Sequence, residues 1–265
     1  MTAMAQFALP DDHMALSAEG QNDPGRPQLT EDVPAAGRLG NVRSGDSDRI
    51  LSPVRCDAEA LIDAALIDRQ VIQLFALVEN AVAGATHAMV SGDHEAARVV
   101  VAADADIDSL YLELEASVQA RLLERPSNPA EMRYLLAVLG MLPELERSGD
   151  LAEHVARRAT RNLPAEIPAR LRGYVQRMGE VACAMWRIAA DSYGSDAGGT
   201  TERLVSLDDE MDDLHVSFIA ELVAAGTPVV VAIELALVGR FYERLGDHAV
   251  NLARRVPTRL SPVEP

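Results

Sequence analysis

Two acidic patterns each occur twice in this chain, in the same order and about 100 residues apart. The stretch Asp104-Ala-Asp-Ile-Asp108-Ser-Leu110 is matched by Asp208-Asp-Glu-Met-Asp212-Asp-Leu214, which has the same Asp-x-x-apolar-Asp-x-Leu spacing. Further along, Glu146-Arg-Ser-Gly-Asp150 is matched by Glu243-Arg-Leu-Gly-Asp247. A repeated order of motifs is typical of a duplicated structural unit, so we expect both halves of the chain to share one fold.

The apolar residues around these motifs recur at helical spacing. From Val231 to Val256 they follow steps of four and three residues, which is the seam of a packed helix. Turn and capping residues separate such stretches at Ser91-Gly92-Asp93, at Asn128-Pro129 and at Thr227-Pro228. In the last two we expect an N-cap followed by proline at the first helical position. The sequence therefore predicts six helices, over residues 57–90, 93–124, 129–160, 166–193, 200–225 and 228–256.

Short connections between long helices favour antiparallel neighbours and hence a bundle. We expect an all-α fold of two tandem three-helix bundles, with the first in residues 56–161 and the second in residues 162–265. Residues 1–55 hold five prolines and several glycines without a sustained apolar period, which predicts a disordered N-terminal extension. Pro143 lies inside the third helix and should kink it by removing the hydrogen bond to Leu139.

The charge of the chain limits its partners. It holds 41 acidic and 24 basic residues, for a formal charge of −17, and every basic residue is arginine. The negative charge argues against nucleic acid as a partner, and the lack of lysine excludes P-loop and Schiff-base chemistry. Cys56 and Cys183 cannot build a disulfide framework or a thiolate zinc site. Because no apolar run has transmembrane length, we expect a cytoplasmic protein that does not span a membrane.

The repeated acids define the candidate site. Their i, i+4 spacing places both carboxylates of a motif on one helix face, at the edge of the apolar sector. In one interpretation, facing pairs from neighbouring helices offer hard oxygen ligands to a divalent or trivalent metal ion, with Asn251 or His154 as an additional ligand. In the other, arginines neutralise the acids as solvated ion pairs. The arginines within reach are Arg147, Arg157, Arg240, Arg244 and Arg254.

A carboxylate-bridged di-metal enzyme or a metal-storage bundle is an alternative, because such proteins also collect carboxylates from four helices. Their di-iron sites need Glu-x-x-His on two helices, and no histidine here has a glutamate three residues before it. The nearest pattern is Asp212-x-x-His215, in one repeat only. His248, beside Asp247, is a candidate ligand or proton relay, although a helical histidine at a bundle surface is more often structural.

The segment Arg240-Phe-Tyr-Glu-Arg-Leu-Gly-Asp-His-Ala-Val-Asn251 resembles the signature of the PhoU family, particularly its actinobacterial form. That signature is Glu-Arg-x-x-Asp-His with an asparagine four residues after the aspartate. Residues 208–215 and 145–156 support the resemblance, which covers about residues 54–257. It implies a non-enzymatic cytoplasmic adaptor, generally a homodimer. Its implied partners are the ATPase subunit of the phosphate ABC transporter and a sensor histidine kinase, and its implied role is negative regulation of phosphate-starvation genes.

The resemblance also implies metal binding, since some PhoU proteins hold metal clusters through these motifs. The expected ions are divalent or trivalent, with Fe, Zn, Mn and Mg as candidates. The first repeat departs from the family pattern, because Ser148 replaces an apolar residue and His154 replaces the asparagine. The ligands that the resemblance implies are Asp104, Asp108, Glu146 and Asp150 in the first repeat, and Asp208, Asp212, Glu243, Asp247 and Asn251 in the second.

The N-terminal extension is a further departure, since members of the family ordinarily begin near Val54-Arg55. The lysine-free, arginine-rich composition suggests a GC-rich genome. We therefore hypothesise that translation starts at position 54 from a GTG codon, which the intact mass of the native protein tests.

Overall fold

The computed structural model describes residues 53–124, 126, 128–161, 163–194 and 199–255, with side chains from Ala64 onward. The predicted extension lies outside the described residues except for residues 53–55, which begin the first helix instead. All regular structure in the described ranges is helical, as predicted. The helices are α1 (Pro53–Ser91), α2 (His94–Leu123), α3 (Pro129–Ala159), α4 (Leu163–Glu166), α5 (Ala169–Gly194), α6 (Thr200–Ala224) and α7 (Val229–Arg255).

The N-cap predicted at Asn128 is confirmed, and Asp93, predicted only as part of the break between two helices, is the N-cap of α2. The Asp93 carboxylate accepts hydrogen bonds from the backbone N–H groups of the second and third residues of α2, and Asn128 does the same for α3, all at 2.9–3.0 Å. The predicted Thr227 cap is wrong. The Thr227 hydroxyl donates instead to the carbonyl of Leu222, 3.3 Å away, and α7 begins one residue later than predicted, at Val229.

The fourth predicted helix, over residues 166–193, is also wrong at its start. The chain there forms the short helix α4, then breaks at Ile167 and Pro168 before α5 begins at Ala169. The break has a steric cause, because the residue before a proline is disfavoured in the α conformation. The described part of the chain therefore has seven helices where six were predicted.

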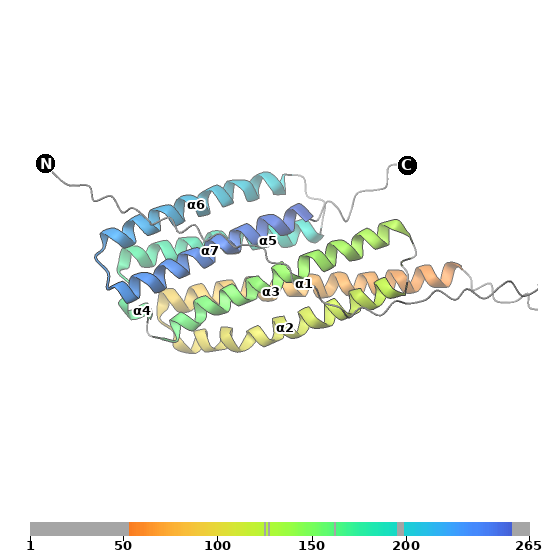
Figure 1. Cartoon of the computed structure of the whole chain (residues 1–265), viewed down its shortest axis with the longest axis horizontal. Coiled ribbons are helices and arrows are strands. Elements are labelled where there is room, and N and C mark those ends of the chain that lie inside the picture. Colours follow the sequence, from red (N-terminus) through yellow and green to blue (C-terminus); the bar gives the residue numbers. More distant parts are fainter. Residues whose placement is uncertain (1–52, 125, 127, 162, 195–198, 256–265) are drawn as a thin grey trace, which may run out of the picture. The chain divides into compact units, whose positions relative to one another are not determined.

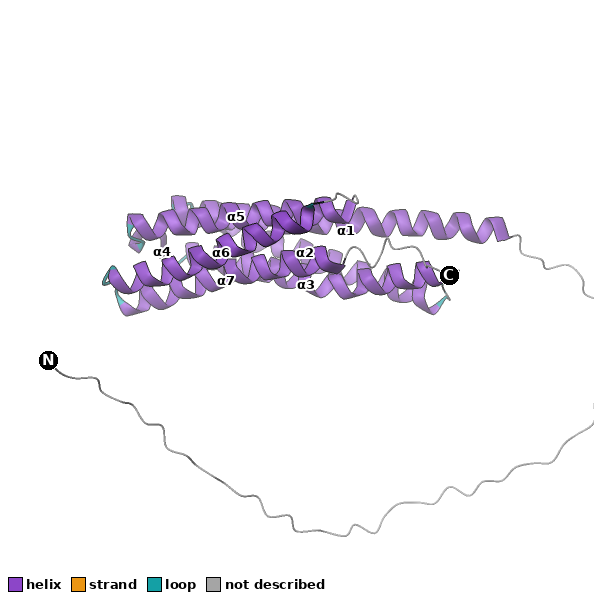
Figure 2. Ribbon diagram, turned by 90° about the horizontal axis from the view of Figure 1, so that it is seen from above, coloured by secondary structure: helices purple, strands orange, loops and turns teal. Residues whose placement is uncertain are grey.

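The long helices form two triplets, which lie one above the other in Figure 1 and overlap in the view from above in Figure 2. In one triplet α1, α2 and α3 all pack against one another, and in the other α5, α6 and α7 do the same. The triplets meet through corresponding helices, α1 against α5 and α3 against α7. Among the described helices, α2 and α6 contact only their own triplet, and they lie on opposite sides of the bundle in Figure 1. This arrangement confirms the predicted fold of two three-helix bundles with an internal duplication.

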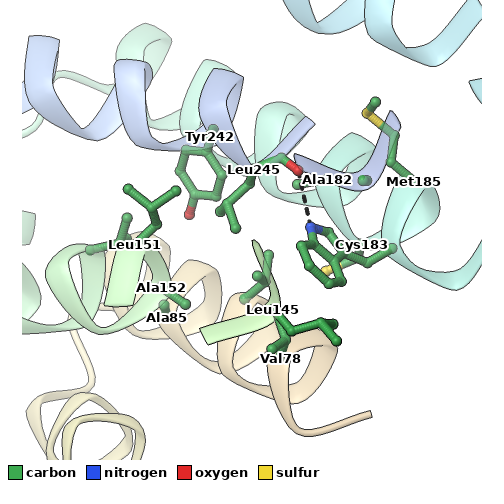
Figure 3. Close-up of a cluster of buried hydrophobic side chains, with 14 of the residues drawn as sticks. Val78, Ala85, Leu145, Leu151, Ala152, Ala182, Cys183, Met185, Tyr242 and Leu245 are labelled. Atoms are coloured by element: carbon green, nitrogen blue, oxygen red, sulfur yellow. Dashed lines mark hydrogen bonds between the residues drawn. The ribbon is translucent and has the colours of Figure 1, made fainter. Parts of the chain in front are cut away.

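The first long helix of each triplet, α1 or α5, contacts three other long helices. Residues 64–91 of α1 are long and apolar enough to cross a membrane by length and composition. Their apolarity has another explanation here, because Val71, Leu74 and Val78 are fully buried against the other helices. The indole of Trp186 on α5 is also buried, and its Nε1 donates to the carbonyl of Leu245 on α7 at 3.1 Å (Figure 3).

Candidate functional site

The first repeat gathers its four predicted acids along the α2–α3 pair. We call Asp104, Asp108, Glu146 and Asp150 the first ridge. Burial, with the negative charges of Glu153, Asp108 and Asp150, raises the pKa of Asp104 to about 6. Burial and the carboxylates of Asp150 and Asp108 also raise the pKa of Glu146. The carboxylates of Asp104 and Glu146 therefore each lie within electrostatic range of Asp108 and Asp150.

Glu153 extends the first ridge and was not predicted. Its side chain is buried on α3 and pairs with Arg157, one turn further along the helix. The sequence did carry a signal, since Glu153 follows Asp150 by three residues and shares its helix face. The predicted additional ligand His154 is exposed, and its ring lies against Phe241 of α7 with centroids 5.5 Å apart. His154 is also close enough to Asp150 to lower the pKa of that carboxyl, against the larger effect of burial.

The second repeat places Asp208, Asp212, Glu243 and Asp247 in the same way along the α6–α7 pair, and we call them the second ridge. Burial, then the charges of Asp212 and Asp247, raise the pKa of Asp208. Burial, then Asp247, raise the pKa of Glu243. One carboxylate oxygen of Glu243 pairs with Arg240, whereas the other, Oε2, is buried and accepts no hydrogen bond. Asn251, the ninth predicted ligand, is exposed on α7 one turn beyond Asp247.

The glycine of each Glu-Arg-x-Gly-Asp motif lies beside the first aspartate of its ridge. A Cβ added to Gly149 would lie 2.9 Å from Cδ1 of Ile107 and 3.4 Å from Oδ1 of Asp104. A Cβ added to Gly246 would lie 3.6 Å from Oδ1 of Asp208. The backbone of α3 or α7 at this point therefore lies directly under the first aspartate of its ridge. Gly149 makes room for the side chain of Ile107, whereas a Cβ at Gly246 would make only ordinary contacts, the nearest at 3.4 Å from Met185.

The donor chemistry of the ridges suits a multivalent cation, because carboxylate oxygens crowd together and one of them, Glu243 Oε2, is buried without a partner. Among the described residues, however, no three His, Cys, Asp or Glu side chains converge closely enough to hold a metal ion. The other interpretation, in which arginines neutralise the acids, holds in part, because Arg157 pairs with Glu153 and Arg240 pairs with Glu243. None of the described arginines forms an ion pair with a ridge aspartate, although Arg157 and Arg254 are close enough to oppose the raised pKa of Asp104 and of Asp208.

His248 joins the two repeats behind the ridges. It is buried at the contact between α7 and α3, with Nδ1 2.9 Å from the Ser148 hydroxyl and Nε2 3.6 Å from Glu144. Ser148 donates its own proton to the Glu144 carbonyl at 2.6 Å, so it accepts from Nδ1–H of His248. Burial lowers the pKa of His248. The serine that departs from the family pattern thus satisfies a buried histidine of the other repeat.

Comparison with known proteins identifies the family. A family model described as the PhoU domain matches residues 71–159 and, a second time, residues 175–256. The chain therefore belongs to the PhoU family. Among curated PhoU proteins, the "Phosphate-specific transport system accessory protein PhoU homolog 2" of Mycobacterium tuberculosis is 32% identical over 175 residues, covering 65% of this chain and 82% of the relative. A PhoU homolog of Caulobacter vibrioides is 27% identical over 203 residues, covering 75% and 88%.

Solved structures of PhoU proteins share the fold. The crystal structure of PhoU from Pseudomonas aeruginosa matches with a TM-score of 0.68 at 23% identity, covering 74% of this chain and 95% of that one. The phosphate transport system regulatory protein PhoU from Streptococcus pneumoniae matches with a TM-score of 0.65 at 17% identity, covering 74% and 94%. The paired helix triplets are therefore the PhoU fold.

The raised pKa of Asp104 predicts a pH-dependent gain in stability for Asp104→Asn. Because the folded state holds the Asp104 proton more tightly than the unfolded chain, ionisation of this group destabilises the fold above about pH 6 and has no effect well below pH 4. We expect Asp104→Asn to raise the free energy of unfolding at pH 7.5 by about 1 kcal/mol, since partial solvation weakens the full effect. Urea unfolding in EDTA measures it.

The gain from Asp104→Asn should fall away as the pH drops from 6 to 4. Asp106→Asn is the matched control, because this neighbouring aspartate is exposed on the same helix and should show no such pH dependence. A gain of equal size at pH 4 and pH 7.5 would contradict a repulsive origin.

Proposed function

We propose that this PhoU protein is a cytoplasmic regulatory accessory protein of phosphate transport. In this role it acts as an adaptor and not as an enzyme. It connects the ATPase subunit of a phosphate ABC transporter to a sensor histidine kinase and represses phosphate-starvation genes when phosphate is plentiful. We also propose that it works as a homodimer.

The observation that carries this proposal is the pair of acidic ridges in matching helices of the two repeats. The family match covers both repeats, and the curated relatives are described as phosphate-specific transport system accessory proteins. The ridges present concentrated negative charge on partly exposed helix faces, which suits protein docking and cation binding. Burial and crowding of like charges raise the pKa of Asp104 and of Glu243, as expected at a surface that binds a positively charged partner.

We propose a two-state mechanism. The transporter and the kinase bind the protein in different states, and each complex shifts the equilibrium available to the other. To hold a multivalent ion such as Fe, Zn, Mn or Mg, Asp208, Asp212, Glu243 and Asp247 of the second repeat would have to draw closer together than they are in this structure, with Asn251 beside them. When bound, such an ion supplies the positive charge that offsets repulsion within the ridge.

Gene deletion tests the adaptor role directly. If the protein represses phosphate-starvation genes, its deletion should leave a phosphate-starvation promoter active in phosphate-rich medium, and the intact gene should restore repression. Normal repression in the deletion strain would contradict the proposed function.

The double variant Glu243→Ala with Asp247→Ala tests the second ridge. Losing two of its four carboxylates should lower the bound metal, measured by elemental analysis, and the kinase recovered by copurification, each by about tenfold. Helicity should be nearly unchanged, because Glu243 and Asp247 lie outside the apolar core. The control is Asp209→Ala with Asp213→Ala, which removes two exposed acids at the same spacing from α6. Equal metal and kinase recovery in both variants would remove the second ridge from the mechanism.

A further inference from the structure

An apolar groove between α6 and α7 is open to solvent in the second repeat. A hollow of about 360 Å³ lies between the end of α6 and the start of α7, and its walls include Ile219, Val223, Val229 and Ile233. Val223 is 80% exposed, Val229 74% and Ile233 57%. None of the described residues that line it is charged. Exposed apolar surface of this extent marks an interaction site more often than a structural one.

The first repeat does not repeat this surface on its second helix. Counted from the matched aspartates, Ile219 and Val223 correspond to Glu115 and Gln119. The first repeat keeps the same ridge with polar residues at both positions, so apolar residues at half-buried Ile219 and exposed Val223 are not required by the fold. Ile219 and Val223 are therefore what distinguishes the second repeat, because Val216, Val229 and Ile233 correspond to the exposed apolar residues Leu112, Met132 and Leu136 of the first repeat.

The groove continues from the second ridge along the same helix faces. On α6, the series Asp208, Asp212, Val216, Ile219, Val223 advances by three or four residues at each step, which keeps one face of the helix. Asp212 and Ile219 are seven residues apart, or about 10 Å along the helix. Val216, between them, is 70% exposed. A segment lying along this face would therefore contact apolar residues at one end and carboxylates at the other.

We propose that this groove and the second ridge together bind an amphipathic helix of a partner protein, with an apolar stripe at one end and arginine or lysine at the other. The apolar stripe would fill the hollow by the helix-in-groove mode of recognition. When the second ridge holds no metal ion, the basic end would meet Asp212 and Asp247, which form no ion pair with a described arginine. Arg240 already pairs with Glu243 and does not neutralise those aspartates.

A second copy of this chain is a poorer occupant. Each copy carries a formal charge of −17 and presents the same acidic ridge beside the groove, so two such faces repel each other. A basic partner gains from the same charges. This inference rests on the proposed function, because it names the surface and the chemistry through which the adaptor would hold a partner.

Placing a positive charge in the groove tests the proposal. Ile233→Arg and Val223→Arg should each activate a phosphate-starvation promoter in phosphate-rich medium by at least about tenfold, since the charge repels a basic helix. The controls are Leu136→Arg and Gln119→Arg, which sit at the corresponding exposed positions of the first repeat and should leave repression intact. All four variants should keep the circular dichroism and melting temperature of the parent, because every site is exposed.

Site-specific crosslinking identifies the occupant. A photoreactive amino acid replacing Val223 in the full chain should form an adduct with another protein. The crosslinked segment, mapped by mass spectrometry, should be an apolar helix flanked by Arg or Lys. The adduct should fall about tenfold with Ile233→Arg and in 0.5 M salt. An adduct between two copies of this chain, a crosslinked segment without basic residues, or no adduct at all would overturn the proposal.

Different results would contradict the adaptor role and the proposed groove. Normal repression after gene deletion contradicts the adaptor role. Loss of repression on deletion, combined with normal repression by Ile233→Arg and Val223→Arg, keeps the adaptor role and overturns only the groove.

Discussion

Trp186→Ala should lower the free energy of unfolding by about 3 to 5 kcal/mol, as is usual for loss of a fully buried large aromatic side chain. Trp186 is 1% exposed and lies on α5, with the ring of Phe75 on α1 at a centroid distance of 6.0 Å and the backbone of α7 beside it. Removal of the indole opens a cavity where three helices from both triplets meet. Urea unfolding followed by circular dichroism measures the loss, since the chain has no other tryptophan for fluorescence.

Trp186→Phe separates packing from hydrogen bonding at this position. Phenylalanine keeps part of the ring volume but cannot donate to the Leu245 carbonyl, so we expect a loss of about 1 to 2 kcal/mol. The Leu245 carbonyl lies inside α7 and keeps its helical hydrogen bond, which limits the cost. Equal losses for alanine and phenylalanine would mean that the hydrogen bond, and not the buried volume, dominates.

The sequence predicted the long helices because their signals are local. Apolar periodicity and capping residues such as Asn128 act within a few residues along the chain, and the structure confirms the Asn128 cap. Threonine often caps helices, but the Thr227 hydroxyl donates to the carbonyl of Leu222 instead. The neighbouring residues do not show which of these two hydrogen bonds forms. The helix predicted over residues 166–193 includes Pro168, whereas in the structure the chain breaks there between α4 and α5.

The acidic ridges were also predictable, since i, i+4 spacing fixes which carboxylates share a helix face. The contacts between repeats were not. Ser148 and His248 are 100 residues apart and form a hydrogen bond that no spacing rule connects. Arg255 at the end of α7 likewise donates to the carbonyl of Gly140 in α3, at 2.9 Å, close to Pro143. The predicted kink at Pro143 stays a prediction.

The second large loss of stability is expected for Gly179→Ala, because Gly179 lies at a close contact between the two triplets. A Cβ added to Gly179 of α5 would lie 2.2 Å from Cγ2 and 2.4 Å from Oγ1 of Thr86 on α1. Thr86 cannot turn away freely, because its hydroxyl is bonded to the Val82 carbonyl at 2.7 Å and to the Tyr242 hydroxyl at 2.8 Å. We expect a loss of about 3 kcal/mol, at the upper end for overpacking, measured by urea unfolding.

Gly173→Ala, on the same helix, should have the opposite effect on stability. Nothing lies within 4 Å of a Cβ added there, so the change should stabilise the protein by about 0.5 to 1 kcal/mol through helix propensity alone. In the Thr86→Ala background, Gly179→Ala should cost at least about 1 kcal/mol less, because the two colliding atoms are gone. Relief should be incomplete, since the Thr86 Cβ itself would lie 2.8 Å away. If Gly179→Ala and Gly173→Ala changed stability alike, helix propensity would govern both sites, and the contact between α1 and α5 would not be the tight seam that joins the two repeats.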